Sequence, residues 1–201
     1  MATEDHIKAI AAVLPWTASG VLPPVDASDP TSPDRSPYVV TLAEYVQRFG
    51  STPERRLIID GLLRYRAALH AAGFKAGFQW LNGSFVENVE LIEGRPPNDI
   101  DVVTFSRPPK AKHKHDLDVL VEALFNPEST VSAYCVDGYF VDLTTAPKAL
   151  TTASTYWYSV WSHRRDLSWK GFIQIDLAPT NGDILQTQPR KSRRTRNEGR
   201  R

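Results

Sequence analysis

Apolar residues recur along this chain at two spacings, one typical of helices and one typical of β-strands. The longest helical stripe covers residues 57–69, follows Thr52-Pro53-Glu54, which suits a helix start, and stops before Gly73. Thr41-Leu42-Ala43-Glu44 has the form of a capping box, so a shorter helix should end at Phe49. Further stripes with helical spacing occupy residues 117–125 and 156–161.

Four other segments have the short apolar runs or the alternation of strands. They cover residues 78–81, 99–105, 131–143 and 172–177, and the third is interrupted at Asp137-Gly138. Helices and strands alternate along the chain, which predicts an α/β (α+β) fold. We expect a small mixed sheet that carries acidic residues on one face, with helices packed behind it.

Both ends of the chain differ from its centre. Residues 3–14 predict a short amphipathic helix, and the proline-rich stretch that follows reads as an extended arm without a core of its own. Arg190 to Arg196 is strongly basic and lacks apolar periodicity, so we expect a disordered tail. The predicted organisation is therefore an N-terminal helix and arm over 1–38, a domain over 39–178, and a basic tail over 179–201.

Composition narrows the class of protein. The formal net charge of +1 conceals an asymmetry, because residues 187–201 hold seven Lys and Arg and one Glu, whereas the remainder holds 17 Lys and Arg against 22 Asp and Glu. A basic tail predicts salt-sensitive binding to RNA or tRNA through phosphates. One cysteine, Cys135, and the lack of an apolar run long enough for a membrane favour a cytoplasmic protein without a membrane partner.

The first chemical motif is Asn82-Gly83-Ser84, between the strand over 78–81 and a helix expected over 85–91. Gly83 lets the backbone approach an anion closely, and free N–H groups at a helix start favour negative charge. Gly83 and Ser84 are therefore predicted to bind phosphate.

The second motif is Asp99-Ile100-Asp101, which leads into the apolar strand over 102–105. Residues i and i+2 of a strand share a face, so both carboxylates should point the same way. Two like charges on a buried strand are costly unless a cation lies between them, and oxygen ligands suit Mg²⁺ or Mn²⁺. Together the two motifs call for a metal-bound nucleoside triphosphate.

Gly83-Ser84 followed by Asp99-x-Asp101 resembles the signature of the DNA polymerase beta nucleotidyltransferase superfamily, and in particular a group of small prokaryotic proteins. The resemblance extends from Gly20 to Gly171. It implies the fold of that superfamily and a two-metal transfer in which Asp99 and Asp101 hold Mg²⁺ ions. It also implies a third metal-binding, catalytic carboxylate on a neighbouring strand.

Two residues compete for that third position. Asp137, followed by a β run, matches what the related small proteins have, and Asp142 is the alternative. The two are five residues apart, so in a regular strand they face opposite sides and only one of them can join Asp99 and Asp101. Asp137 is preferred. Arg164 and Lys170 are candidates for binding the triphosphate oxygens.

The sequence thus predicts an enzyme that moves a nucleoside monophosphate from a triphosphate to an acceptor hydroxyl on RNA or tRNA, a protein or a small molecule, with release of pyrophosphate. One alternative is a catalytically degenerate nucleotide- or RNA-binding regulatory module, such as one component of a toxin–antitoxin pair acting on a protein partner. Another is a metal-dependent phosphohydrolase, which would share the carboxylates.

Overall fold

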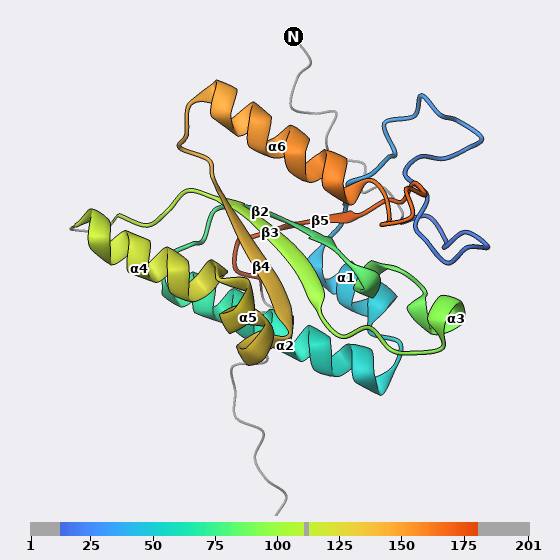
Figure 1. Cartoon of the computed structure of the whole chain (residues 1–201), viewed down its shortest axis with the longest axis horizontal. Coiled ribbons are helices and arrows are strands. Elements are labelled where there is room, and N and C mark those ends of the chain that lie inside the picture. Colours follow the sequence, from blue (N-terminus) through green and yellow to red (C-terminus); the bar gives the residue numbers. More distant parts are fainter. Residues whose placement is uncertain (1–12, 111–112, 181–201) are drawn as a thin grey trace, which may run out of the picture.

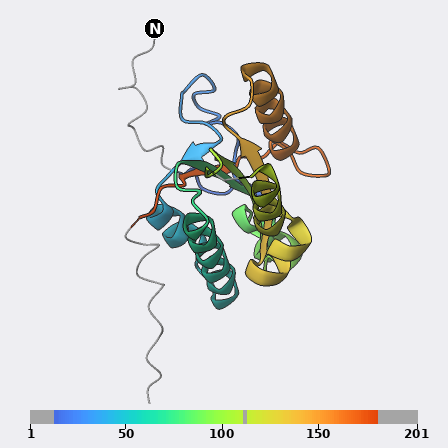
Figure 2. The same cartoon turned by 90° about the vertical axis from the view of Figure 1, so that its left-hand side faces the viewer.

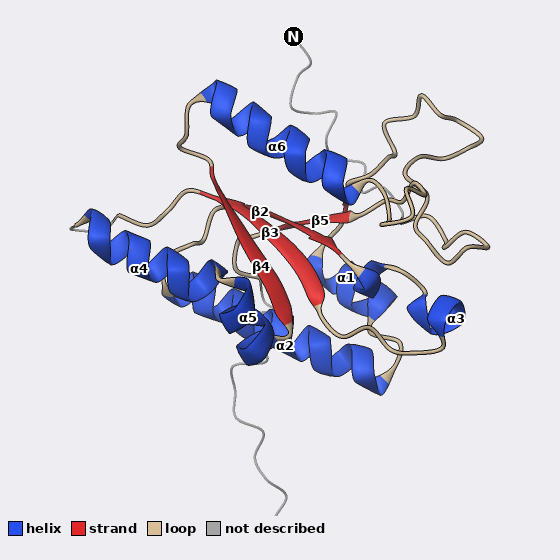
Figure 3. Cartoon of the chain, in the orientation of Figure 1, coloured by secondary structure: helices blue, strands red, loops and turns tan. Residues whose placement is uncertain are grey.

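A computed structural model describes residues 13–110 and 113–180. The predicted N-terminal helix and the basic tail lie almost wholly outside these residues. Within them the chain forms a five-stranded mixed sheet, in the order β1-β5-β2-β3-β4, and six α-helices (Figures 1 and 3), an α+β arrangement. The strands are β1 (Tyr38–Val39), β2 (Gly77–Asn82), β3 (Ile100–Ser106), β4 (Val136–Asp142) and β5 (Ile173–Asp176). The helices are α1 (Leu42–Phe49), α2 (Pro53–Ala71), α3 (Val89–Glu93), α4 (Lys114–Phe125), α5 (Pro127–Tyr134) and α6 (Pro147–Trp161).

The strand directions explain why the sheet is mixed. β2 is antiparallel to both of its neighbours, β3 and β5, whereas the outer pairs β1–β5 and β3–β4 are parallel. The last strand in sequence, β5, therefore lies inside the sheet, where both of its edges are hydrogen-bonded. The parallel β3–β4 pair is joined by α4 and α5, the kind of helical crossover that parallel strands require.

The predicted helices α1 and α2 are confirmed, together with their caps. The Thr41 hydroxyl accepts a hydrogen bond from the Glu44 N–H, and the Glu44 carboxylate accepts one from the Thr41 N–H, which completes the capping box. At the start of α2 the Thr52 hydroxyl accepts a hydrogen bond from the Arg55 N–H, and Pro53 occupies the first helical position. Local signals are sufficient for both helices because their caps and apolar stripes agree.

Helices cover both faces of the sheet, not one face as predicted. α1, α2, α4 and α5 lie on one side, and α6 crosses the other (Figures 1 and 2). On the α6 side a second core cluster joins Trp161 and Trp157 of α6 to Trp80 and Phe105 of the sheet and to Phe172, which directly precedes β5. Phe78 and Trp80, at alternate positions of β2, and Phe105 of β3 need this cover, since a sheet with apolar side chains on both faces must bury both.

The predicted strand over residues 131–143 is wrong in its first part. Residues 127–134 form α5, and β4 then runs from Val136 through Asp137-Gly138 without a break. Asn126 and Pro127 decide the outcome, because the Asn126 side chain caps the Ser129 N–H and Pro127 occupies the first helical turn. Helix-start chemistry here outweighs the strand preference of Val131.

No helix in the described part of the chain is both long enough and apolar enough to cross a membrane.

Candidate functional site

The register of β3 and β4 brings two of the predicted acidic residues together. The strands are parallel, and Asp101 pairs directly with Asp137 at the start of both. Asp142 lies at the opposite end of β4, across from Ser106, where its carboxylate accepts hydrogen bonds from the N–H and the hydroxyl of Thr144. Only Asp137, of the two candidates for the third carboxylate, is therefore beside Asp101.

Both carboxylates face the side of the sheet that α6 covers. Asp101 is two residues before Val103, and Asp137 is two residues before Tyr139, and both of these partners pack in the cluster around Trp161. The acidic residues therefore lie just beyond the end of the aromatic core, where the strands begin.

Gly83 approaches Asp101 so closely that no side chain fits between them. A Cβ atom on Gly83 would lie 2.1 Å from Asp101 Oδ2, and the Gly83 backbone has φ +79° and ψ −167°, which only glycine adopts readily. The β2–β3 register pairs the preceding residue, Asn82, directly with Asp101. The predicted phosphate turn and the predicted metal ligand are thus in direct contact.

Burial and the negative charges of neighbouring carboxylates raise the pKa values of Asp101 and Asp99. Desolvation of the Asp101 carboxyl, reinforced by the negative charges of Asp137 and Asp99, raises its pKa to about 7, while the Lys170 ammonium acts in the opposite direction. The pKa of Asp99 is also raised, first by burial and then by the charge of Asp137, against a smaller effect of Arg95. This electrostatic environment favours a cation.

The Asp137 carboxylate has two different oxygen atoms. Oδ2 accepts a hydrogen bond of 3.0 Å from the Tyr139 hydroxyl, whereas Oδ1 is buried and has no hydrogen-bond partner. A buried carboxylate oxygen without a partner is costly, and a hard cation such as Mg²⁺ would satisfy it. The residues present therefore fit a divalent metal. Among the described residues, however, no three acidic, histidine or cysteine side chains converge on one point, so a metal site would have to draw these carboxylates together.

The helix expected after Ser84 is wrong. Ser84–Val86 is a single 3-10 turn that ends at Glu87, whose φ −97° and ψ 159° are extended, and α3 begins only at Val89. The phosphate argument based on a helix N-terminus therefore does not hold. The close approach of the Gly83 backbone remains.

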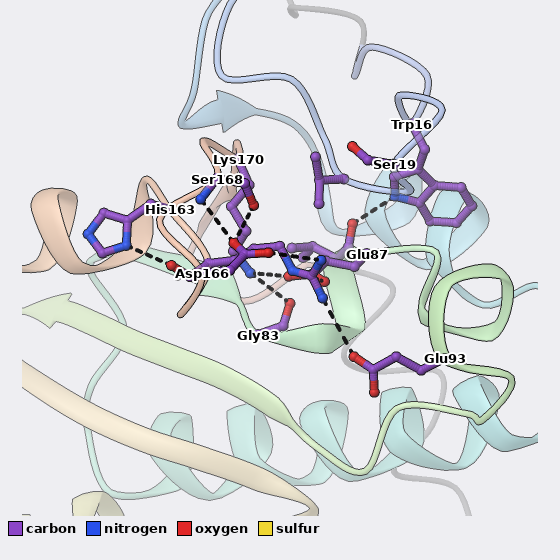
Figure 4. A network of polar contacts seen from close by, with 12 residues as sticks. Trp16, Ser19, Gly83, Glu87, Glu93, His163, Asp166, Ser168 and Lys170 are labelled. Atoms are coloured by element: carbon purple, nitrogen blue, oxygen red, sulfur yellow. Dashed lines mark hydrogen bonds and ion pairs between the residues drawn. The ribbon is translucent and has the colours of Figure 1, made fainter.

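Glu87 is the centre of a buried charge network beside this turn (Figure 4). Lys170 Nζ lies 2.6 Å from Glu87 Oε1 and donates a second hydrogen bond, of 3.3 Å, to the Gly83 carbonyl. Arg164 Nε lies 3.3 Å from Glu87 Oε2. Of the two predicted phosphate-binding cations, Lys170 therefore contacts the Gly83-Ser84 turn directly, and both are ion-paired with Glu87, the residue at which the turn ends. No sequence signal marked Glu87.

A buried arginine of α2 holds the same segment from the other side. Arg55 is 1% exposed, donates to the carbonyls of Phe85 and Glu87, and forms a 2.6 Å ion pair with Glu90. The Trp16 indole also donates to the Val86 carbonyl, so the N-terminal arm adds a further contact. A cation in the first turn of a helix interacts unfavourably with the helix dipole. The position of Arg55 in the first turn of α2 could therefore have indicated from the sequence that this residue needs an acidic or carbonyl partner.

A groove lies on α6, on the face of the sheet toward which the carboxylates point. It has a volume of about 670 Å³ and an apolar lining, and it is formed by residues of α6 and the residue before it. Trp157 lines the groove and also packs on Tyr139, with ring centroids 4.6 Å apart.

Residues 14–176 match a protein family described as a family of unknown function (DUF6932), and the chain belongs to this family. No curated protein and no solved structure matches the chain.

Proposed function

We propose that this member of a family of unknown function is a metal-dependent nucleotidyltransferase. Asp101 and Asp137 lie side by side on neighbouring parallel strands, and Asp101 lies against the side-chain-free surface of Gly83; this observation carries the proposal. The raised pKa of Asp101 and the unpartnered Oδ1 of Asp137 support it, because both indicate carboxylates arranged for a cation. The finer assignment, to the DNA polymerase beta-like superfamily, is part of this proposal.

Each residue would have a distinct task. Asp99, Asp101 and Asp137 would hold two Mg²⁺ or Mn²⁺ ions, which supply charge neutralisation of the triphosphate and a lowered pKa of the acceptor hydroxyl. Gly83 and Ser84 would bind the distal phosphates through backbone and hydroxyl groups. Lys170 and Arg164, which pair with Glu87, would turn toward the more negative triphosphate. Asp137 Oδ2 would receive the proton of the acceptor hydroxyl.

One observation favours a second candidate, a nucleotide-binding regulatory module without transfer activity. The described carboxylates do not already converge on one point, and both cations are already ion-paired with Glu87. Such a protein would bind a triphosphate with Mg²⁺ and leave it intact. The phosphohydrolase alternative has no comparable support.

The test is to incubate the full chain with each α-labelled nucleoside triphosphate, Mg²⁺ or Mn²⁺, and total RNA or a cell extract. We expect label on one class of acceptor together with release of pyrophosphate. Triphosphate that binds with Mg²⁺ but stays intact would favour the regulatory module. Release of orthophosphate without label transfer would favour the hydrolase.

The chain offers a matched pair of control variants. Asp137→Asn should reduce turnover strongly and largely spare triphosphate affinity, because the third carboxylate acts on the acceptor. Asp142→Asn removes an identical charge from the far end of the same strand, where the carboxylate only caps a turn, and should leave turnover close to that of the wild type. The reverse order would reject the assignment of Asp137.

A further inference from the structure

The hydrogen bond between Tyr139 and Asp137 places a hydroxyl of this chain in the proposed site. Tyr139 Oη lies 3.0 Å from Asp137 Oδ2, the oxygen that would receive the proton of an acceptor. Asp137 Oδ1 stays buried and unpartnered, so the hydroxyl does not occupy the oxygen that would face a metal. An acceptor hydroxyl would have to make the same contact with Asp137.

The ring of Tyr139 is fixed in this position. Tyr139 and Asp137 are two residues apart on β4 and share a face of the sheet, so the contact spans a rigid element and not a loop. On its other side the ring packs against Trp157 of α6, with centroids 4.6 Å apart and an angle of 51° between the planes. Tyr139 as a whole is only half-buried, so the residue is not sealed inside the core.

We propose that Tyr139 is a site of self-modification, at which the protein attaches a nucleoside monophosphate to its own phenolic oxygen. This inference rests on the proposed function. The bond from Tyr139 Oη to the α-phosphorus of a nucleoside triphosphate forms, and the bond from that phosphorus to the bridging oxygen of the β-phosphate breaks. Pyrophosphate leaves, and the phenolic proton passes to Asp137 Oδ2. The product is a tyrosyl phosphodiester.

The modification has a consequence for other acceptors. The ester carries its nucleotide on the oxygen that contacts Asp137, so a modified chain has no free position there for a second hydroxyl. Self-modification would therefore limit the activity of each molecule.

The direct test uses the full chain, each of the four ribonucleoside triphosphates in turn, and Mg²⁺ or Mn²⁺. Intact-mass spectrometry should show the addition of one nucleoside monophosphate per chain, and peptide mapping should place it on Tyr139. Tyr139→Phe and Asp137→Asn should abolish the mass increase. Tyr156→Phe is the matched control, because Tyr156 is an exposed tyrosine on α6 and its loss should leave the modification unchanged.

A second measurement needs neither metal nor nucleotide. With ¹³C-labelled tyrosine, the ring resonance that disappears in Tyr139→Phe should shift in Asp137→Asn and stay in place in Asp142→Asn. If the chemical shift of the Tyr139 ring is the same in Asp137→Asn as in the wild type, the inference is overturned, because the contact would be absent in solution. Thermal midpoints are measured first, to show that each variant is folded before its resonances and its modification are compared with those of the wild type.

The two levels of proposal fail in different ways. If the wild type releases pyrophosphate or labels an external acceptor but Tyr139 stays unmodified, or if another residue takes the label, the inference is overturned and the proposed function stands. If pyrophosphate release and label transfer are both absent, both proposals fail. A labelled Tyr139 supports both.

Discussion

At the scale of single residues, the ionisation of Asp101 has the clearest measurable consequence. Its pKa in the folded protein is raised from 3.8 to about 7, so the folded state holds this proton more tightly than the unfolded state does. Ionisation of Asp101 therefore lowers the free energy of unfolding. This destabilisation is absent below pH 4, grows as the pH rises from about 4 to 7, and is complete above about pH 7. By linkage it reaches at most about 4 kcal/mol.

Asp101→Asn removes this loss, since Asn stays neutral at every pH. We expect the metal-free variant to be more stable than the wild type by a few kcal/mol at pH 8 and equally stable near pH 4. Asp99→Ala should also stabilise the metal-free protein at pH 8, by a smaller amount. Chemical denaturation across this pH range measures the difference, and a variant that is unfolded at room temperature would show that Asp101 is structural. Added Mg²⁺ should stabilise the wild type most above pH 7 and the Asp101→Asn variant much less.

Gly83 allows a second prediction with a matched control. Gly83→Ala forces a left-handed φ on a residue with a side chain and drives its Cβ against Asp101 Oδ2, so it should cost about 3 kcal/mol. Gly94→Ala also meets a positive φ, of 65°, but nothing lies within 4 Å of its Cβ. It should cost only about 1 kcal/mol, as expected for the left-handed conformation alone.

The contact with Asp101 is then isolated by a double variant. In an Asp101→Ala background the carboxylate is gone, so Gly83→Ala should cost less than it does in the wild type. It should still cost more than Gly94→Ala, because the φ +79° and ψ −167° of Gly83 are less accessible to alanine than the αL conformation of Gly94. Equal costs for the two glycine substitutions in the wild-type background would contradict the close approach of Gly83 to Asp101. These costs are measured by urea denaturation of the wild type, Gly83→Ala, Gly94→Ala, Asp101→Ala and the double variant.

At the scale of elements, the segment between β2 and β3 owes its shape to buried charges and not to helix propensity. It contains a single 3-10 turn and the five-residue α3, neither long enough to be stable alone. Arg55 of α2 holds it on one side, and Lys170 and Arg164, from the segment before β5, hold it on the other. Glu87 contacts both of the latter cations.

Glu87→Ala should therefore be among the most damaging single substitutions in the chain. It leaves the Lys170 ammonium, in a residue that is 5% exposed, buried without a counter-charge, for which we expect a loss of about 3–5 kcal/mol. Glu93→Ala removes another partner of Arg164, at 3.6 Å, but this pair is near the surface and should be worth about 0.5 kcal/mol. Thermal unfolding of both variants compares them, and similar midpoints would contradict the central role of Glu87.

The same elements show what a sequence reveals and what it does not. α1 and α2 were predictable because caps and apolar periodicity are local properties. The helix expected after Ser84 was not formed, because tertiary ion pairs with Arg55 and Lys170 decide the path of that segment. The position of α6 was equally hidden, since an aromatic stripe indicates burial but not which face of the sheet it covers.

The candidate site was predictable only in part, for a related reason. Strand spacing alone predicts that Asp99 and Asp101 share a face, but β3 begins at Ile100, one residue after Asp99, so only Asp101 is placed by the strand. The contact of Asp101 with Asp137 depends on the register of two strands separated by two helices, and the start of β4 was hidden by the unpredicted α5. The role of Glu87 could not be predicted because its partners, Arg164 and Lys170, are distant in sequence. The role of Tyr139 could not be predicted because its contact with Asp137 depends on the rotamer of the side chain.

At the scale of the whole molecule, charge is divided unevenly between residues 1–186 and residues 187–201. Residues 187–201 carry seven Lys and Arg and one Glu, whereas the rest of the chain holds 17 Lys and Arg against 22 Asp and Glu. The carboxylate site belongs to the acidic portion. An acceptor made of RNA would be repelled there, so attraction would have to come from the basic end.

Deleting residues 187–201 tests this division. The thermal midpoint should be nearly unchanged, because the deleted sequence has no apolar pattern with which to pack. RNA binding should weaken and its salt dependence should flatten, since each lost phosphate contact lowers the slope of log K against log salt by about 0.7 for single strands. Filter binding at several salt concentrations measures the slope. A matched control replaces the seven cations with Gln at full length, which keeps the chain and removes only the charge. If both proteins retain the wild-type slope, the basic end has no part in nucleic-acid binding, and an RNA acceptor would have to be recognised by the folded domain alone.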